Sequence, residues 1–184
     1  MIYPIYIYGS PVLRKETEPV PADYPDFKSF VSDMFDTMYA ADGVGLAAPQ
    51  IGKSLRMFVI DATPFEEDDD RLAGFKKVFV NPDIYERSEE TVSMGEGCLS
   101  FPKLNEDVTR SKSIRIRYQD ENFAEHDEAY DGLAARIIQH EYDHIEGKVF
   151  TDHLSALRKT LIKNKLNAFT KGKYSARYKC KLVK

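Results

Sequence analysis

The clearest pattern of apolar and polar positions near the start of the chain is helical. Six apolar residues recur there at spacings of one, three and four: Phe27, Phe30, Val31, Met34, Phe35 and Met38. This spacing places them on one face of a helix, and Asp26 stands where an N-cap would. We therefore predict a helix over about 27–40. The next segment, Asp42-Gly-Val-Gly-Leu-Ala-Ala-Pro49, contains glycines and a proline and is predicted to be a loop.

The middle of the chain predicts strands. Three segments are rich in β-branched and aromatic residues: Arg56–Asp61, Val78–Asn81 and Ile114–Tyr118. The polar run Asp120-Glu-Asn122 predicts a hairpin turn that leads to a partner strand around 123–129.

Two more helices are predicted in the last third of the chain. Asp131 is placed to cap a helix that runs to about Ile145, and Ser155 begins another that runs to about Phe169. Strands come first and helices follow, without regular βαβ alternation. The predicted fold class is therefore α+β.

Composition indicates one folded domain. The chain has 184 residues, of which 42% are hydrophobic, and it shows neither an internal repeat nor a low-complexity linker. We expect one catalytic domain over 1–170 and a basic tail over 171–184. The N-terminus lacks the features of a signal peptide, and no stretch approaches the ~20 apolar residues of a membrane span. Two cysteines, Cys98 and Cys180, imply no disulfide framework and favour the cytoplasm.

Charge is distributed unevenly. Of the 26 Lys and Arg residues, ten lie in 158–184, a segment without Asp or Glu, which leaves 16 basic against 30 acidic residues in 1–157. Such a tail either meets an anionic partner or is attracted to its own acidic body. The acidic run at 66–70 lacks the alternation of a calcium loop and is predicted to be a solvated loop.

The strongest chemical signal is His140-Glu141-Tyr142-Asp143-His144. Two histidines at i and i+4 project from one helical face and can bind one metal ion, while the glutamate beside them can act on a metal-activated water. The alternative is a pair of ordinary buried histidines. The pentapeptide favours the metal site without deciding the function.

The identity of the third metal ligand narrows the class of metalloenzyme. A metzincin would carry a third histidine at the position of Phe150, and a thermolysin-like protease needs a later acidic ligand, but no acidic residue follows Asp152. Upstream, Cys98 follows two glycines, Gly95 and Gly97, and would offer a thiolate suited to iron or zinc. Alone, it would be read as a small buried hydrophobe.

Three segments together resemble, in chain order, the signature motifs of peptide deformylases. They are Gly43-Val-Gly-Leu-Ala-Ala-Pro-Gln50, Glu96-Gly-Cys-Leu-Ser100 and Gln139-His-Glu-Tyr-Asp-His144. Ile7-Tyr-Gly-Ser-Pro-Val-Leu-Arg14 and Asp131-Gly-Leu-Ala-Ala-Arg136 extend the resemblance, which covers most of 1–154. The acidic insertion near 66–70 and the tail beyond about Gly172 depart from it. The resemblance implies antiparallel sheets wrapped around a central metal-binding helix, with one helix before it and one after.

The resemblance also implies the chemistry. Cys98, His140 and His144 would bind one metal ion per chain, physiologically Fe²⁺, with Zn²⁺, Ni²⁺ or Co²⁺ as substitutes. Metal-bound water would hydrolyse the N-formyl group of formyl-methionine on new polypeptides. Glu141 would move the proton as general base and then acid, while the Gln50 amide and the Leu99 backbone N–H would stabilise the oxyanion.

The resemblance further implies how the substrate binds. The residues expected to line an apolar pocket for the methionine side chain are Val44, Met94, Leu133, Ile137 and His140. Arg136 is expected at the pocket mouth with its charged head in water. Backbone at Gly45 and Gly97 would pair with the peptide as an added strand.

Further expectations concern Asp143 and the tail. Asp143, charged within a partly buried helix, needs a partner, for which we predict Arg110. The basic C-terminal segment is expected to dock on the ribosome near the nascent-chain exit, and residues 174–182 alternate as a strand would. Neither a membrane nor DNA is expected as a partner. A metallopeptidase or other metal amidohydrolase and a zinc-stabilised ribosome-associated domain are the alternatives.

Overall fold

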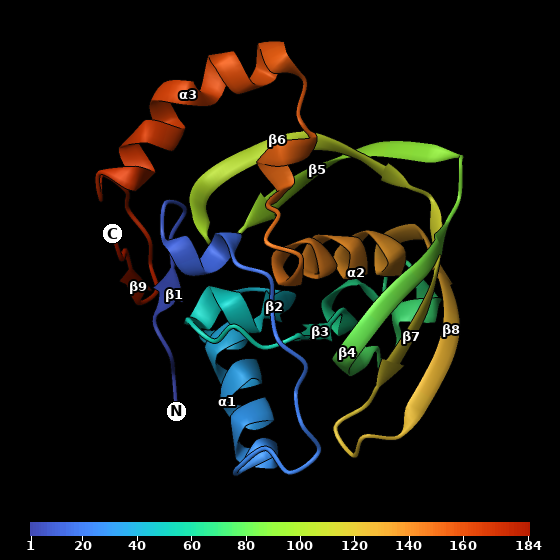
Figure 1. Cartoon of the computed structure of the whole chain (residues 1–184). Coiled ribbons are helices and arrows are strands. Elements are labelled where there is room, and N and C mark those ends of the chain that lie inside the picture. The colour runs from blue at the N-terminus through green and yellow to red at the C-terminus, as the bar shows by residue number, and fades with distance from the viewer.

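A helix lies at the centre of the molecule. The computed structural model describes all residues 1–184, and in it α2 (Gly132–Ile145) is surrounded by strands on several sides (Figure 1). Every residue from Ala134 to Ile145 is buried. The α+β class and the arrangement of antiparallel sheets around the metal-binding helix are therefore as expected. No helix of the structure is long and apolar enough to cross a bilayer.

The larger sheet has five antiparallel strands in the order β2-β3-β4-β7-β8. Their bounds are Gly45–Ala47 (β2), Met57–Asp61 (β3), Lys76–Arg87 (β4), Ser113–Gln119 (β7) and Glu125–Asp131 (β8). Four of these strands were predicted: β3 with one residue too many at its start, β4 and β7 too short, and β8 with shifted bounds. The segment that forms β2 was predicted to be a loop. Because β2 is the last strand in the order, one of its edges has no strand partner.

A separate hairpin covers the other side of α2. It consists of β5 (Thr91–Cys98) and β6 (Phe101–Ser111), which pair only with each other and are joined by a turn at Leu99 and Ser100. The register slips between Gly97 and Cys98, so that Cys98 pairs with Phe101. Neither strand was predicted from the sequence.

The two outer helices match their predicted ranges to within one or two residues. α1 (Phe27–Ala40) packs its apolar face beside β2 and β3, and α3 (Ala156–Thr170) lies along the outside of the molecule (Figure 1). Ser155 caps α3 by accepting the Arg158 backbone N–H. Asp26 and Asp131 occupy N-cap positions without a capping side-chain hydrogen bond.

The two ends of the chain meet. β1 (Ile5–Tyr6) pairs in parallel with β9 (Cys180–Lys181), the only strand residues in the C-terminal segment, which is shorter than the strand expected over 174–182. The acidic run at 66–70 lies, as expected, in the connection between β3 and β4, where short 3-10 turns flank it.

Candidate active site

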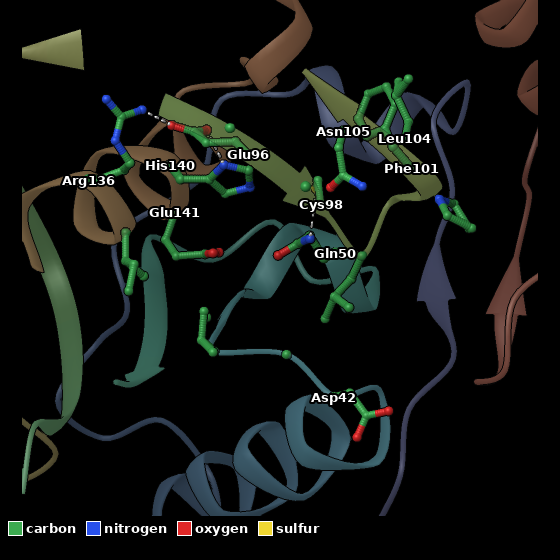
Figure 2. A pocket seen from close by; sticks show the side chains of 18 of the residues that line it. Asp42, Gln50, Glu96, Cys98, Phe101, Leu104, Asn105, Arg136, His140 and Glu141 are labelled. Atoms are coloured by element: carbon green, nitrogen blue, oxygen red, sulfur yellow. Dashed lines mark hydrogen bonds and ion pairs between the residues drawn. The ribbon is translucent and has the colours of Figure 1, made fainter. Parts of the chain in front are cut away.

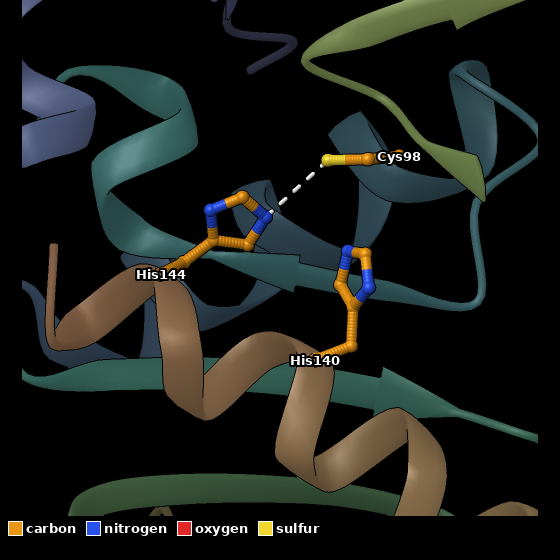
Figure 3. Close-up of side chains that lie close together, drawn as sticks. All are labelled: Cys98, His140 and His144. Atoms are coloured by element: carbon orange, nitrogen blue, oxygen red, sulfur yellow. Dashed lines mark hydrogen bonds between the residues drawn. The ribbon is translucent and has the colours of Figure 1, made fainter. Parts of the chain in front are cut away.

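The proposed metal ligands lie together above α2. His140 and His144 are one turn apart on the helix, and Cys98 ends β5 directly opposite them (Figure 3). One donor atom of each residue lies within 4.8 Å of the others, and Cys98 Sγ is 3.3 Å from His144 Nε2. Both histidines are buried. A thiolate and two imidazoles at this separation form a donor set suited to iron or zinc.

Glu96 orients the first of these histidines. His140 Nδ1 lies 2.8 Å from Glu96 Oε2 (Figure 2). An ionised carboxylate only accepts hydrogen bonds, so Nδ1 carries the proton and Nε2 presents its lone pair. This tautomer is the one needed for metal ligation through Nε2.

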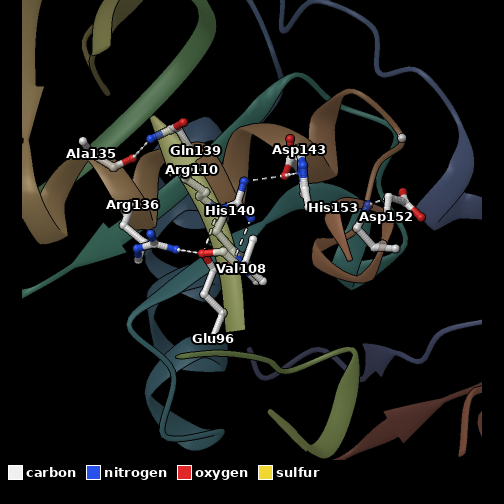
Figure 4. A network of polar contacts seen from close by, with 12 residues as sticks. Glu96, Val108, Arg110, Ala135, Arg136, Gln139, His140, Asp143, Asp152 and His153 are labelled. Carbon is white, nitrogen blue, oxygen red and sulfur yellow. Dashed lines mark hydrogen bonds and ion pairs between the residues drawn. The ribbon is translucent and has the colours of Figure 1, made fainter. Parts of the chain in front are cut away.

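A buried network of charges holds Glu96 in place (Figure 4). Arg110 donates to both of its carboxylate oxygens, at 2.6 and 3.0 Å, and reaches Asp143 Oδ2 at 2.7 Å with its remaining nitrogen. Burial alone would raise the pKa of Glu96, but hydrogen bonds from His140 and Arg110 lower it well below its usual range. Glu96 therefore stays ionised, and the predicted partnership of Asp143 with Arg110 is confirmed.

Glu141 points into the space beside the ligands. Its carboxylate lies so close to β2 that a Cβ on Gly45 would clash with Oε1. Oε2 is buried without a hydrogen-bond partner, and burial raises the pKa of Glu141 to about 7. A group with this pKa can both take and return a proton near neutral pH. Its unpartnered oxygen is suited to a water molecule beside the metal site.

Gln50 approaches the same space from the other side. Its Oε1 accepts the Ala47 backbone N–H at 2.9 Å, which turns Nε2 toward Cys98 Sγ, at 3.6 Å, and Ser100 Oγ, at 3.3 Å. Gln50 is 1% exposed, so its orientation is fixed by packing as well as by hydrogen bonds. The amide N–H groups therefore face the ligand cluster (Figure 2).

A cleft of about 370 Å³ opens over this cluster. Among the residues that line it are Val44, Gly45, Gln50, Met94, Gly97, Cys98, Leu99, Leu133, Arg136, Ile137, His140 and Glu141. These are all of the predicted site residues except His144, which is 1% exposed and does not line the cleft. The ligand cluster thus has one side open to a bound molecule, as a catalytic metal site requires.

A family model for polypeptide deformylase matches residues 2–160. The chain belongs to the peptide deformylase family. A curated peptide deformylase of Christiangramia forsetii is 52% identical and covers 97% of this chain and 95% of its own. The peptide deformylase of Flavobacterium johnsoniae is 50% identical and covers 100% of this chain and 97% of its own length. Among solved structures, the peptide deformylase of Thermus thermophilus superposes with a TM-score of 0.82 at 41% identity, covering 94% and 99%.

The function expected from the motifs is thereby confirmed. A peptide deformylase is a metal-dependent hydrolase that removes the N-formyl group from new polypeptides. The Cys98, His140 and His144 cluster agrees with a metal-dependent enzyme. The alternatives, a metallopeptidase and a structural zinc domain, find no support.

The predicted position of Arg136 in this deformylase is wrong. Its side chain is 7% exposed, and the guanidinium lies inside the protein instead of in water. It donates to Glu96 Oε1 at 2.6 Å, to the Val108 carbonyl at 2.9 Å and to the Val92 carbonyl at 2.6 Å. Through these hydrogen bonds Arg136 joins α2 to both strands of the hairpin. Glu96 supplies the negative charge that makes burial of the guanidinium possible.

Sequence reasoning missed several residues of the site. Glu96 stands two positions before the Cys98 ligand, and that spacing was the only available signal for it. Asp42, Lys103, Asn105 and Tyr178 also line the cleft. Tyr178 comes from the C-terminal segment, far along the chain, and no local pattern would have placed it here.

Proposed function

We propose that Cys98, His140 and His144 bind one catalytic metal ion per chain, physiologically Fe²⁺, which Zn²⁺, Ni²⁺ or Co²⁺ can replace. The observation that carries this proposal is the convergence of three donor atoms within 4.8 Å beside the unpartnered carboxylate of Glu141. A divalent ion held there would polarise the formyl carbonyl and lower the pKa of a water molecule.

The residues of the chain divide the remaining work. Glu141 accepts the proton of the attacking water and delivers it to the amine that leaves, since its pKa of about 7 suits both steps. The Gln50 amide and the Leu99 backbone N–H donate to the oxygen that gains negative charge. Donors already in place at that oxygen are worth ~10²–10³ in turnover each.

The cleft supports binding of a formyl-methionyl peptide. Its apolar residues, which we assign to the methionine side chain together with His140, are Val44, Met94, Leu133 and Ile137. Arg136 lines the same cleft and donates a hydrogen bond to Glu96. β2 and β5 each have a strand edge without a partner, so the peptide backbone can pair with Gly45 and Gly97 as an added strand.

We also propose that the enzyme acts in the cytoplasm, close to the ribosome. Residues 1–170 would form the catalytic domain, and the basic segment 171–184 together with α3 would contact ribosomal RNA near the nascent-chain exit. The support is the charge of α3 and the tail, where Lys163, Lys171 and Lys173 are exposed and make no ion pair. Arg158 is different, because it pairs with Glu106.

Metal content and turnover of point variants test the assigned roles. Cys98→Ala and His140→Ala should each lose bound metal and deformylation of formyl-Met-Ala, because a catalytic site with three protein ligands loses affinity when one is removed. Glu141→Ala should retain metal but lose activity by ~10²–10⁴. A folded Glu141→Ala protein without metal would contradict the assignment of Glu141 to proton transfer alone.

Metal identity is tested by decay in air. If Fe²⁺ is held by the Cys98 thiolate, the iron enzyme should lose activity in air as the iron or the sulfur oxidises. The Ni²⁺ and Zn²⁺ forms should decay more slowly, since neither ion is readily oxidised. Activity is followed on formyl-Met-Ala over time, with an anaerobic sample as the control. Equal decay of all three forms would argue against iron as the sensitive component.

A further inference from the structure

The C-terminal segment returns to the active-site hairpin. After α3, residues 171–184 run back beside β1, where the Ile5 and Ile7 N–H groups donate to the Lys179 and Lys181 carbonyls at 2.8 and 2.9 Å (Figure 1). This pairing fixes the position of Tyr178, the residue just before it. Tyr178 thereby comes to line the cleft, next to the turn that joins β5 and β6.

The hydroxyl of Tyr178 contacts that turn directly. It donates a hydrogen bond to the Leu99 carbonyl at 2.7 Å. The side chain is half-buried, and burial raises its pKa above the usual value for tyrosine, so the hydroxyl remains a donor throughout the working pH range. The contact joins residues 79 positions apart in the chain.

Other contacts hold the same turn from different directions. The Ser100 carbonyl accepts the Tyr8 N–H at 2.9 Å, and Ser100 Oγ lies 3.3 Å from Gln50 Nε2. The Leu99 side chain packs so closely on Gly43 that a Cβ there would be 2.8 Å from Leu99 Cδ1. Tyr178 supplies the hydrogen bond to the Leu99 carbonyl, and this bond restricts rotation of the backbone at Leu99.

We propose that Tyr178 is a positioning residue for deformylation. By holding the Leu99 carbonyl, it keeps the Leu99 N–H aimed at the formyl oxygen; this rests on the proposed role of that N–H as an oxyanion donor. A donor stabilises the developing charge only if it is oriented before the reaction, so a loose turn lowers turnover without weakening substrate binding. The C-terminal segment is therefore part of the active site.

Tyr178→Phe tests the proposal, because it removes the hydroxyl and keeps the ring that forms part of the cleft wall. Tyr174→Phe is the matched control: Tyr174 lies on the same segment and is partly buried, but it does not bond to the turn. For Tyr178→Phe we expect kcat on formyl-Met-Ala to fall ~10-fold, a fraction of the loss of a whole donor, with KM unchanged within a factor of about two. Tyr174→Phe should match the parent enzyme.

Backbone amide exchange, measured by NMR on the metal-loaded proteins, separates this proposal from the assignment of Leu99. Faster exchange at Leu99 and Ser100 in Tyr178→Phe, together with the lower kcat, supports both. Unchanged exchange would overturn the positioning role and leave the assignment of Leu99 intact. Faster exchange with unchanged kcat would overturn both, because the Leu99 N–H would then not contribute to turnover. A kcat loss that merely follows a lower melting temperature, shared by Tyr174→Phe, would also overturn the positioning role.

Discussion

At the scale of single residues, the space around Glu141 decides whether the site can work. Gly45 leaves that space, because a methyl group at this position would clash with Glu141 Oε1. Glu141 is buried along the rest of its length and cannot retreat without displacing its neighbours. The glycine is thus required by the proximity of a side chain, and its backbone does not have a positive φ.

Gly45→Ala should therefore displace the Glu141 carboxylate and lower kcat by ~10² or more, the usual contribution of a positioned general base. Bound metal should remain, because the atoms nearest to the added Cβ all belong to Glu141 and not to a metal ligand. Gly95→Ala on β5 is the control: a Cβ there would meet Asp107 Oδ1 at an ordinary 3.6 Å. Turnover on formyl-Met-Ala and metal content are measured for both. Full activity in Gly45→Ala would show that Glu141 has more freedom than the packing indicates.

The metal-binding residues could be predicted from sequence because their signal is local. His140 and His144 share one helical face at a spacing that needs no tertiary information, and the absence of a later ligand pointed back to Cys98. Glu96 could not be predicted, since its role depends on the place of β5 over α2. The same absence of tertiary information explains the error at Arg136, a residue type that usually keeps its charge in water.

At the scale of elements, Arg110 connects β6 to both β5 and α2. Its side chain is 3% exposed, and its two carboxylate partners, Glu96 and Asp143, are 6% and 12% exposed. Removal of a buried cation leaves its partners charged inside the protein. The packing of the hairpin on the central helix therefore depends on this one side chain more than on any surface pair.

Arg110→Ala should lower the free energy of unfolding by about 3–5 kcal/mol, the usual cost of breaking a buried ion pair by removing one partner. Lys112→Ala is the control. Lys112 follows the last residue of β6, and its ion pair with Glu90 is exposed, so its removal should change the free energy of unfolding little. Urea unfolding of the metal-loaded proteins measures both. Besides Arg110, Glu96 contacts Arg136 and His140, and Asp143 Oδ2 lies 2.7 Å from His153 Nε2. Equal stability of the two variants would mean that these contacts compensate both carboxylates without Arg110.

The elements that sequence patterns missed are those that build the cleft. On β6 the buried positions alternate as a strand requires, but two of them are Glu106 and Arg110, so the alternation is not one of apolar and polar residues. β5 is mostly exposed and contains two glycines, which weaken strand propensity. α1 was predictable because its buried face is apolar over several turns.

At the scale of the whole molecule, charge and chain path together determine how the enzyme can meet a partner. α3 lies on the outside of the molecule (Figure 1), and Leu157 and Leu161 on it are 70% and 64% exposed. The backbone of the tail beyond it pairs with β1, where the Ile5 and Ile7 N–H groups donate to the Lys179 and Lys181 carbonyls. A basic surface of this kind is suited to an anionic partner.

Reversal of charge on this surface should weaken binding to ribosomes while leaving deformylation intact. We expect Lys163→Glu, Lys171→Glu and Lys173→Glu together to reduce co-sedimentation with ribosomes at low salt, because each lysine lost reduces the number of counterions that binding releases from RNA. These side chains are exposed and make no ion pair, so the fold should tolerate the change. Turnover on free formyl-Met-Ala should equal that of the parent enzyme.

The control for ribosome binding carries the same change in net charge outside α3 and the tail. Lys15→Glu, Lys28→Glu and Lys53→Glu alter three exposed lysines that also lack ion pairs. If attraction to RNA were a matter of net charge, both triple variants would lose binding equally. We expect only the triple variant in α3 and the tail to lose ribosome binding. We also expect the affinity of the parent enzyme for ribosomes to fall steeply as salt rises. Unchanged sedimentation of that variant at low salt would contradict ribosome docking through the C-terminal segment.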